Sequence, residues 1–328
     1  MTFAHSGKRV LLLAMLIQAS VFFLQAVHAQ TNSVPLQIVV PFAPGGSVDI
    51  LARQLSPALS SRLGRPVTIA NMPGAGGEIG AGAVARSRPD GSSVLLQSVG
   101  VTIIQALRKA PAFDVRRDLA PITQAAESPM AIYVNPSLPV HTVRELINYA
   151  KENPGKLNFA SSGMGSANHL YMELFRAAAG INMVHIMYSG GTGTTMAVVK
   201  NEAQVLITDG LGATRKQAEA GAVRALAIAL PSRSPLLPDL PTIAESGLPG
   251  YEAPYWYGFF TAVKTPADIV QKLNTDIISV LNEVALRDRL APQGYSVKGS
   301  SPAAFKAVVE QEVAKWEKLV KDANIPRE

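Results

Sequence analysis

The chain has 328 residues, of which 48% are hydrophobic and 16% are charged, so it is long enough for two lobes with a sizeable core. Its formal net charge is +6. Since no cluster of Lys and Arg with interleaved aromatic residues occurs, we expect no nucleic-acid partner. The lack of cysteine excludes disulfides, thiolate metal sites and a lipid-bearing cysteine.

The first 29 residues have the pattern of a secretory signal peptide. Lys8 and Arg9 precede an apolar run over residues 10–26, and the small-residue sequence VHA ends at Ala29, before Gln30. Polar residues interrupt the run, which argues against a membrane anchor. We expect cleavage near Ala29–Gln30 and a periplasmic mature protein. Its 28 basic and 24 acidic residues give a net charge of +4, because Lys8 and Arg9 are removed.

Apolar runs then alternate with helical patterns. Continuous apolar segments predict buried strands at 36–42, 66–72 and 92–99, and amphipathic patterns predict helices over 47–64 and 78–88. A β-α-β-α-β order with continuously apolar strands predicts a parallel sheet with helices on both faces.

A second α/β series follows residue 134. Thr142 and Glu145 form a predicted capping box at the start of a helix. The remaining predicted strands are 156–162, 183–189, 204–210, 223–230 and 251–263, and the remaining predicted helices are 142–155, 168–180, 194–203, 212–222, 266–290 and 302–323.

The two series predict two α/β lobes. Segments 120–134 and 225–242 mix extended residues with prolines and are the expected crossings between the lobes. We assign residues 30–127 and 231–328 to one domain and residues 128–230 to the other. Two crossings leave a ligand cleft between the lobes and a hinge at its base.

Four glycine-containing turns each join a predicted strand to a predicted helix, at 41–49, 71–80, 161–170 and 188–195. In an open α/β sheet such turns lie at the carboxyl ends of the strands, where ligands bind to helix N-termini. The alternative is that these glycines only make tight turns. Because all four turns would face one crevice, a shared ligand site is the favoured interpretation.

The first turn illustrates the expected chemistry. Gly45 and Gly46 allow close approach of backbone N–H groups, and Ser47 is placed to cap the following helix. Neither the GxGxxG spacing nor the lysine of a nucleotide-binding loop is present. A site made of neutral donors at a helix N-terminus suits a carboxylate that is released again.

Several polar residues allow two interpretations. Asp49 either offsets the dipole at the start of the helix, which we favour, or contacts the ligand. Asp209 either lines the cleft or starts a turn. His169 is expected to be a structural histidine. The run Tyr255–Tyr257 is mainly a core candidate, although one ring can wall the cleft.

Enzyme signatures are lacking in the sequence. There is no GxSxG or HExxH motif, no GxxxxGK[ST] loop, and no His/Asp/Glu grouping with metal-ligand spacing. We therefore expect no catalytic residue, no bound metal and no cofactor.

The sequence resembles the Bug family, the periplasmic substrate-binding proteins of tripartite tricarboxylate transporters. The resemblance rests on residues 40–98, on SSGMGSANHLYMELF (161–175), on YSGGTGTTMAVV (188–199) and on LPDLPTIAESGLPGYE (237–252), which follow in the family's order. It implies the two-lobed, type II-like periplasmic binding protein fold, with two doubly wound domains. It also implies a small carboxylate ligand held by backbone amides, short polar side chains and water.

By position, the resemblance implies contacts from both lobes. In the first lobe these are Phe42, Ala43, Pro44, Gly45, Gly46 and Ser47, with Asp49 as a further candidate, and Gly76 and Gly77; in the second they are Ser162, Gly163, Ser166, Gly191, Thr192, Gly193 and Thr194, with Asp209 as a further candidate. Many relatives have proline where this chain has Thr194, and Ala43 and Val48 occupy positions that vary in the family.

The implied function is a monomeric, non-enzymatic receptor. It captures a dicarboxylate, a tricarboxylate, an acidic amino acid or an aromatic carboxylate and docks transiently on the membrane subunits of the transporter. The alternatives are a ligand-sensing module of a two-component system and, less favoured, an enzyme on the same fold.

Overall fold

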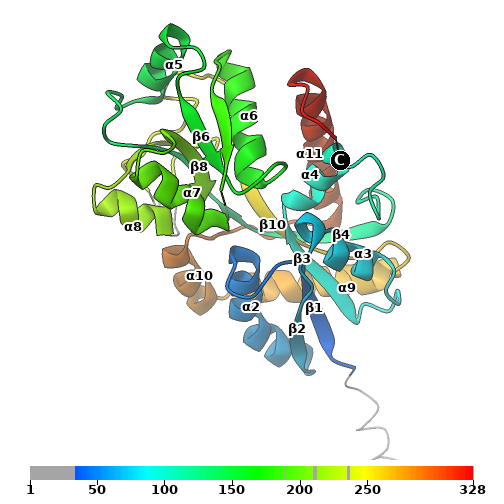
Figure 1. Ribbon diagram of the computed structural model, residues 1–328. Helices are drawn as coiled ribbons and strands as arrows, with labels where there is room; N and C mark the ends of the chain where they lie inside the picture. The colour runs from blue at the N-terminus through cyan, green and yellow to red at the C-terminus, as the bar shows by residue number, and fades with distance from the viewer. Residues whose placement is uncertain (1–33, 189, 210–212, 235–236, 328) are drawn as a thin grey trace, which may run out of the picture.

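The computed structural model describes residues 34–188, 190–209, 213–234 and 237–327, which form two lobes, each built on its own β-sheet (Figure 1). The expected signal peptide, residues 1–29, lies outside the described residues. In the part of the chain that the structure describes, no helix is long and apolar enough to span a membrane.

The first lobe contains a six-stranded mixed sheet in the order β11-β4-β10-β3-β1-β2. Its strands are β1 (Leu36–Val40), β2 (Val67–Asn71), β3 (Ser93–Ser98), β4 (Leu119–Ser128), β10 (Tyr255–Ala262) and β11 (Ser296–Val297). Its helices are α2 (Ser47–Leu63), α3 (Glu78–Ala85), α4 (Gly100–Leu107), α9 (Ala267–Leu281), α10 (Val284–Leu290) and α11 (Pro302–Asp322), with short 3-10 segments η1 (Ala75–Gly77) and η2 (Ala291–Gln293).

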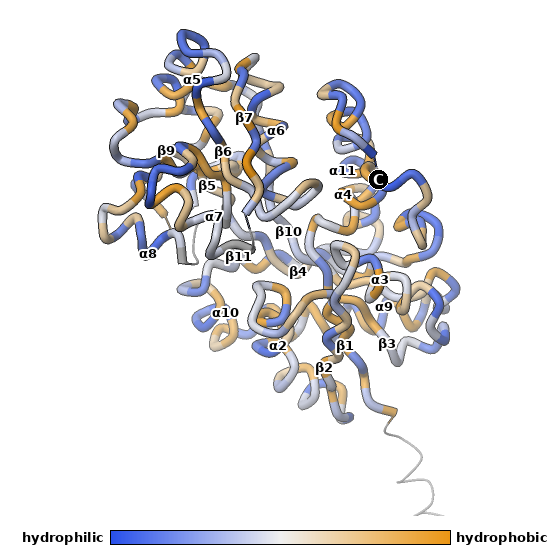
Figure 2. The backbone as a smooth tube through the Cα atoms, viewed as in Figure 1, coloured by the Kyte–Doolittle hydropathy of each residue, from blue (hydrophilic) through white to orange (hydrophobic). Residues whose placement is uncertain are grey.

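Strands β1, β2 and β3 are parallel, as their apolar runs predict. Strand β10 is antiparallel to both of its neighbours, β3 and β4, so the complete sheet is mixed. Successive residues of β1 are buried on opposite faces. Ile38 and Val40 lie in the core with α2, α9 and α10, whereas Val39 lies in the core with α3, α4 and α11. Both faces of the sheet are therefore covered by helices, and the strands are mainly hydrophobic (Figure 2).

The second lobe contains a five-stranded sheet in the order β7-β6-β8-β5-β9. Its strands are β5 (Met130–Val134), β6 (Asn158–Ser161), β7 (Val184–Met187), β8 (Val205–Asp209) and β9 (Arg224–Ile228); its helices are α5 (Val143–Glu152), α6 (Ala167–Ala179), α7 (Gly190–Val199) and α8 (Ala213–Glu219). Thr142 is confirmed as the N-cap of α5, but Glu145 reaches back to the residue before Thr142 and not to Thr142 itself. The Thr142 hydroxyl accepts the N–H of Glu145 at 3.1 Å, and the Glu145 carboxylate accepts the N–H of His141 at 2.6 Å.

Within the described residues, the chain crosses between the lobes twice. The first crossing follows the prediction, because β4 and β5 belong to different sheets and are separated only by Pro129. The second lies later than the predicted segment 225–242. Ile228 bridges Thr242, and the N–H of Ala253 donates to the carbonyl of Ala229 at 3.0 Å, so the chain stays with the second sheet until β10 begins. The division into domains at 127/128 and 230/231 remains a prediction.

The lobes also touch beside the second crossing and at α11, away from both crossings. The Tyr171 hydroxyl on α6 donates to the carbonyl of Pro254 at 2.8 Å. The ring of Tyr171 lies 5.3 Å from that of Trp316 on α11, and both side chains are buried. One continuous hydrophobic cluster therefore includes residues from α4 and α11 of the first lobe and from α6 of the second.

Candidate ligand-binding site

A cavity of about 860 Å³ lies between the lobes, within the size range of small-molecule sites. The residues that line it from the first lobe are Phe42, Ala43, Pro44, Gly45, Gly46, Ser47, Val48, Ala75, Gly76, Ser98, Gly100, Ile103, Ile104, Leu107, Arg108, Tyr255 and Pro326. Those from the second lobe are Met130, Ser162, Met164, Gly165, Ser166, Ala167, Asn168 and Thr208.

The first glycine turn lines this cavity and leads into α2. Gly45 has φ +87°, which favours glycine, while Gly46 is extended and forms the N-cap of α2. The expectation that Ser47 caps this helix is wrong. Ser47 is already the first helical residue, and no side chain caps the helix. The Tyr295 hydroxyl donates to the carbonyl of Ser47 at 2.7 Å and so holds the start of α2.

The side chain of Asp49 stabilises the first glycine turn through hydrogen bonds. Its side chain is buried and accepts the N–H of Gly45 at 2.8 Å, Nε of Arg53 at 2.8 Å and Nδ2 of Asn71 at 2.9 Å. The hydrogen bond from Arg53 is the main cause that lowers the pKa of Asp49 to about 2. This geometry favours the helix-start interpretation of Asp49, because its carboxylate is committed to protein donors and it does not line the cavity.

The second glycine turn contributes Ala75 and Gly76 to the cavity wall, but Gly77 is buried behind it. Gly77 has φ +104°, and a Cβ atom there would lie 2.6 Å from Nε2 of Gln97. A packing constraint therefore explains this glycine, which we expected to contact the ligand.

The turn before α6 lines the cavity from the second lobe, and Asn168 organises it. The Asn168 side-chain carbonyl accepts the Ser162 hydroxyl at 3.1 Å and the Ser166 hydroxyl at 2.7 Å. Gly163 does not line the cavity. Its carbonyl accepts the Ser166 hydroxyl at 2.6 Å, and its φ of +131° favours glycine.

The two lobes thus present equivalent structures to one cavity. The 17-residue helix α2 begins there from the first lobe, and the 13-residue helix α6 begins there from the second. Neither helix has a side-chain hydrogen bond at its N-cap, since Gly46 has no side chain and the Ser166 hydroxyl accepts no N–H of α6. A helix N-terminus carries about half a unit of positive charge and exposed N–H donors, so this arrangement suits an anion.

Two stacked histidines lie beneath the second-lobe turn. The rings of His169 and His185 are 4.1 Å apart, and the ring of Phe159 is 4.8 Å from that of His185. Nδ1 of His169 accepts the N–H of Gly165 at 3.2 Å, and His185 shares a 2.5 Å hydrogen bond with the Ser161 hydroxyl. Burial lowers the pKa of His169 to about 3, and the neighbouring His185 adds to this effect. His169 is thus a neutral structural histidine, as expected.

The turn over 188–195 is placed differently from our expectation. Thr192, Gly193 and Thr194 lie in the first turn of α7 but do not line the cavity. Thr194 is fully buried, and the adjacent Thr195 hydroxyl lies 2.7 Å from that of Thr214 on α8. Packing of α7 against α8 therefore accounts for Thr195, while Thr194 is buried and Thr192 is exposed.

Two further candidates are not resolved by this geometry. The position of Gly191 relative to the cavity and the side chain of Asp209 lie outside the described residues. The backbone of Asp209 ends β8 and is paired with Met130 of β5.

Sequence reasoning missed one wall of the cavity. Helix α4 was not predicted, yet Gly100, Ile103, Ile104 and Leu107 line the cavity, and Arg108 follows them. The segment is short and mainly apolar, with Thr102 and Gln105 as its polar side chains, and Figure 2 colours most of it as hydrophobic. Tyr255 lines the cavity, whereas Trp256 and Tyr257 are buried, in line with the expectation that one of these rings could reach the cleft.

Among the described residues, no group of three or more His, Asp and Glu could hold a metal ion.

Comparisons with known proteins agree with this architecture. Residues 51–325 match the model of the tripartite tricarboxylate transporter family receptor. Protein BugT of Bordetella pertussis is 34% identical over 294 residues, covering 88% of this chain and 89% of BugT. A structure of an R. palustris protein with adipate is 34% identical, with a TM-score of 0.78, and covers 90% of this chain and 98% of that one.

A second solved relative, MatC from Rhodopseudomonas palustris with bound malate, is 30% identical, with a TM-score of 0.74. The alignment covers 87% of this chain and 98% of MatC. Since both the family model and these relatives span nearly the whole described chain, the protein belongs to the tripartite tricarboxylate transporter receptor family.

Proposed function

We propose that this protein is a periplasmic receptor that binds a small organic carboxylate between its lobes and delivers it to a tripartite transporter in the membrane. The observation that carries the proposal is the pair of helix N-termini, α2 and α6, that enter one cavity from opposite lobes without side-chain caps. Their free N–H donors and partial positive charges suit a carboxylate. Relatives with bound adipate and malate support this choice of ligand class.

The contacts proposed for the carboxylate come from the residues that the two turns bring to the cavity. In the first lobe these are Phe42 to Ser47 and Gly76, and in the second they are Ser162 and Ser166. Apart from the Gly45 N–H, which donates to Asp49, the backbone N–H groups of these turns are neutral donors, so binding of the first carboxylate relies on neutral groups. Such a site releases its ligand more readily than one closed by several ion pairs, which suits delivery to a transporter.

Delivery requires that the ligand favours one arrangement of the lobes. The two crossings, at Pro129 and just before Tyr255, allow the lobes to rotate about a shared base. A ligand that contacts both lobes shifts this equilibrium only through contacts that are better in the closed form. The closed form is then the one that docks on the membrane subunits. Export through the signal peptide of residues 1–29 would place the receptor in the periplasm.

A binding screen tests the proposal. The mature protein is heated with organic acids, amino acids, sugars and cations, and positive compounds are titrated by calorimetry. We expect a carboxylate at 100 times its Kd to stabilise the fold by about 2.7 kcal/mol. Stabilisation by sugars or cations alone would contradict the proposal. Delivery is tested by uptake of the positive acid into cells that lack the gene and into cells that carry it.

A further inference from the structure

The charge distribution of the cavity is one-sided. Among the described residues that line it, Arg108 is the only one with a charged side chain, and none carries a carboxylate. The nearby carboxylate of Asp49 is buried beneath the first turn and bound to Arg53 and Asn71. The cavity therefore offers one cation in addition to the two helix N-termini, and the described lining offers no anionic partner for a ligand ammonium group.

Arg108 is held in place by the structure around it. It follows α4 as the C-cap residue, and its N–H donates to the carbonyl of Ile104 at 3.0 Å. Its Nε lies 3.4 Å from a carboxylate oxygen of Glu78, and the other oxygen of Glu78 accepts the N–H of Ala112 at 2.5 Å. The side chain is 28% exposed. A half-buried, anchored guanidinium is ordered before the ligand arrives, which reduces the entropy lost on binding.

Arg108 directly follows an apolar part of the wall in the sequence. The side chains of Ile103, Ile104 and Leu107 line the cavity on α4, together with Met130 and Met164 from the second lobe. This surface favours burial of hydrocarbon, and it offers no hydrogen bonds to a polar ligand body.

We infer that Arg108 is a specificity-determining residue that pairs with a second carboxylate of the ligand, while the turns before α2 and α6 hold the first. The preferred ligand is then a dicarboxylate with a hydrocarbon middle, which packs against the apolar wall. This inference rests on the proposed function, because it assigns a role within the same cavity. Arginine suits this role because its planar guanidinium group can bind a carboxylate through two parallel hydrogen bonds.

The test compares two ligands that differ only in the second acid group. Calorimetry measures the Kd of adipate and of hexanoate for the wild type and for Arg108→Gln. We expect the wild type to bind adipate about 10- to 100-fold more tightly than hexanoate, as for a hydrogen-bonded charge pair. Arg108→Gln should lose most of this preference by weakening adipate binding, with hexanoate affinity nearly unchanged. Arg108→Lys should retain part of the preference, because the positive charge remains but the pair of parallel hydrogen bonds is lost.

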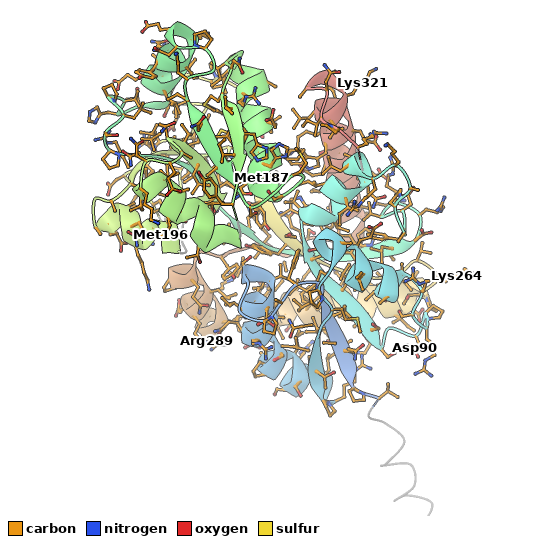
Figure 3. The ribbon with its side chains drawn as sticks, viewed as in Figure 1. Asp90, Met187, Met196, Lys264, Arg289 and Lys321 are labelled. Atoms are coloured by element: carbon orange, nitrogen blue, oxygen red, sulfur yellow. The ribbon has the colours of Figure 1, made fainter. Side chains whose placement is uncertain are left out.

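The matched control is Arg88→Gln. Arg88 is 80% exposed and lies 3.7 Å from Asp90, which Figure 3 labels at the outer edge of the first lobe. This variant should keep the wild-type preference. Equal wild-type affinity for adipate and hexanoate, or equal weakening of both by Arg108→Gln, would overturn the inference and leave the proposed function standing. A wild-type protein that binds no carboxylate would overturn both.

Discussion

The carboxylate of Asp49 accepts a hydrogen bond from the backbone N–H of Gly45 at 2.8 Å, and this contact joins the first turn of α2 to the loop in front of it. The same carboxylate pairs with Arg53 and accepts a bond from Asn71 on β2. One buried acid thus ties together strand, turn and helix at the edge of the cavity.

Replacing Asp49 is expected to loosen this turn. Asp49→Ala removes four hydrogen bonds to a buried group and should lower the free energy of unfolding by about 2–4 kcal/mol. Asp49→Asn keeps an acceptor for Gly45 and should cost about half as much. Urea denaturation measures both effects, and ligand titration should show weaker binding in the same order. Asp90→Ala, at a more exposed acid, is the control; an Asp49→Ala protein as stable and as tight-binding as wild type would contradict this account.

The adjacent glycines, Gly45 and Gly46, are expected to respond differently to substitution. Gly46 has φ −75°, and a Cβ atom there would meet only the carbonyl oxygen of Ala43, at 3.7 Å. Gly46→Val should therefore fold with nearly wild-type stability but obstruct the amides that face the cavity, lowering carboxylate affinity by at least about tenfold. Gly45→Val places a β-branched residue at φ +87° and should cost about 1–3 kcal/mol of stability.

Thermal unfolding and ligand titration separate these two outcomes. Unchanged carboxylate affinity in a folded Gly46→Val protein would show that the ligand does not approach this turn.

Gly165 of the second lobe and Leu107 of the first meet at the cavity wall. A Cβ atom on Gly165 would lie 2.7 Å from Cδ1 of Leu107, and Gly165 has φ +73°. Gly165→Ala should therefore disturb the approach of the lobes and weaken ligand binding. Part of that loss comes from the clash with Leu107. The double variant Gly165→Ala/Leu107→Ala should therefore lose less binding free energy than the sum of the losses in the two single variants. A coupling of about 0.5–1.5 kcal/mol in a double-mutant cycle is expected; strictly additive losses would show that backbone strain alone is responsible.

Local sequence patterns predicted the elements that depend on local physics. The strands β1, β2 and β3 are continuous apolar runs, and the start of α5 is marked by Thr142 and Glu145. These signals act within a few residues, and the structure agrees with them. The segment predicted as one helix over 266–290 is divided into α9 and α10 at Asn282–Glu283, which no glycine or proline marks in the sequence.

The candidate site depended on contacts that local patterns do not encode. Glycine turns predicted the loops before α2 and α6, but the same pattern at 188–195 is followed by Thr195, whose hydroxyl contacts Thr214 of α8. Gly77 is favoured by its φ of +104° and by the close side chain of Gln97, which lies 20 positions further along the chain. Arg108 has no spacing or motif that distinguishes it from other arginines. Its significance comes from the fold, which makes it the only charged side chain among the described cavity residues.

The buried His169 gives the protein a defined response to mild acid. Its pKa is lowered to about 3 in the folded state, against an ordinary value of 6.5. Between these values the unfolded state carries a proton on this ring and the folded state does not, so the free energy of unfolding falls as the pH is lowered through this window. One such group contributes a slope of up to about 1.4 kcal/mol per pH unit. His185 contributes in the same direction, because burial also lowers its pKa.

His169→Gln tests this response while leaving a side-chain acceptor for the N–H of Gly165. Urea denaturation is followed at several pH values between 4.5 and 6, above the range in which Asp49 titrates. We expect the variant to take up about one proton fewer than the wild type on unfolding. Its free energy of unfolding should therefore depend less steeply on pH. His141→Gln, at an exposed histidine, is the control for replacing a histidine by glutamine. Equal slopes in the wild type and His169→Gln would mean that His169 takes up its proton in the folded protein.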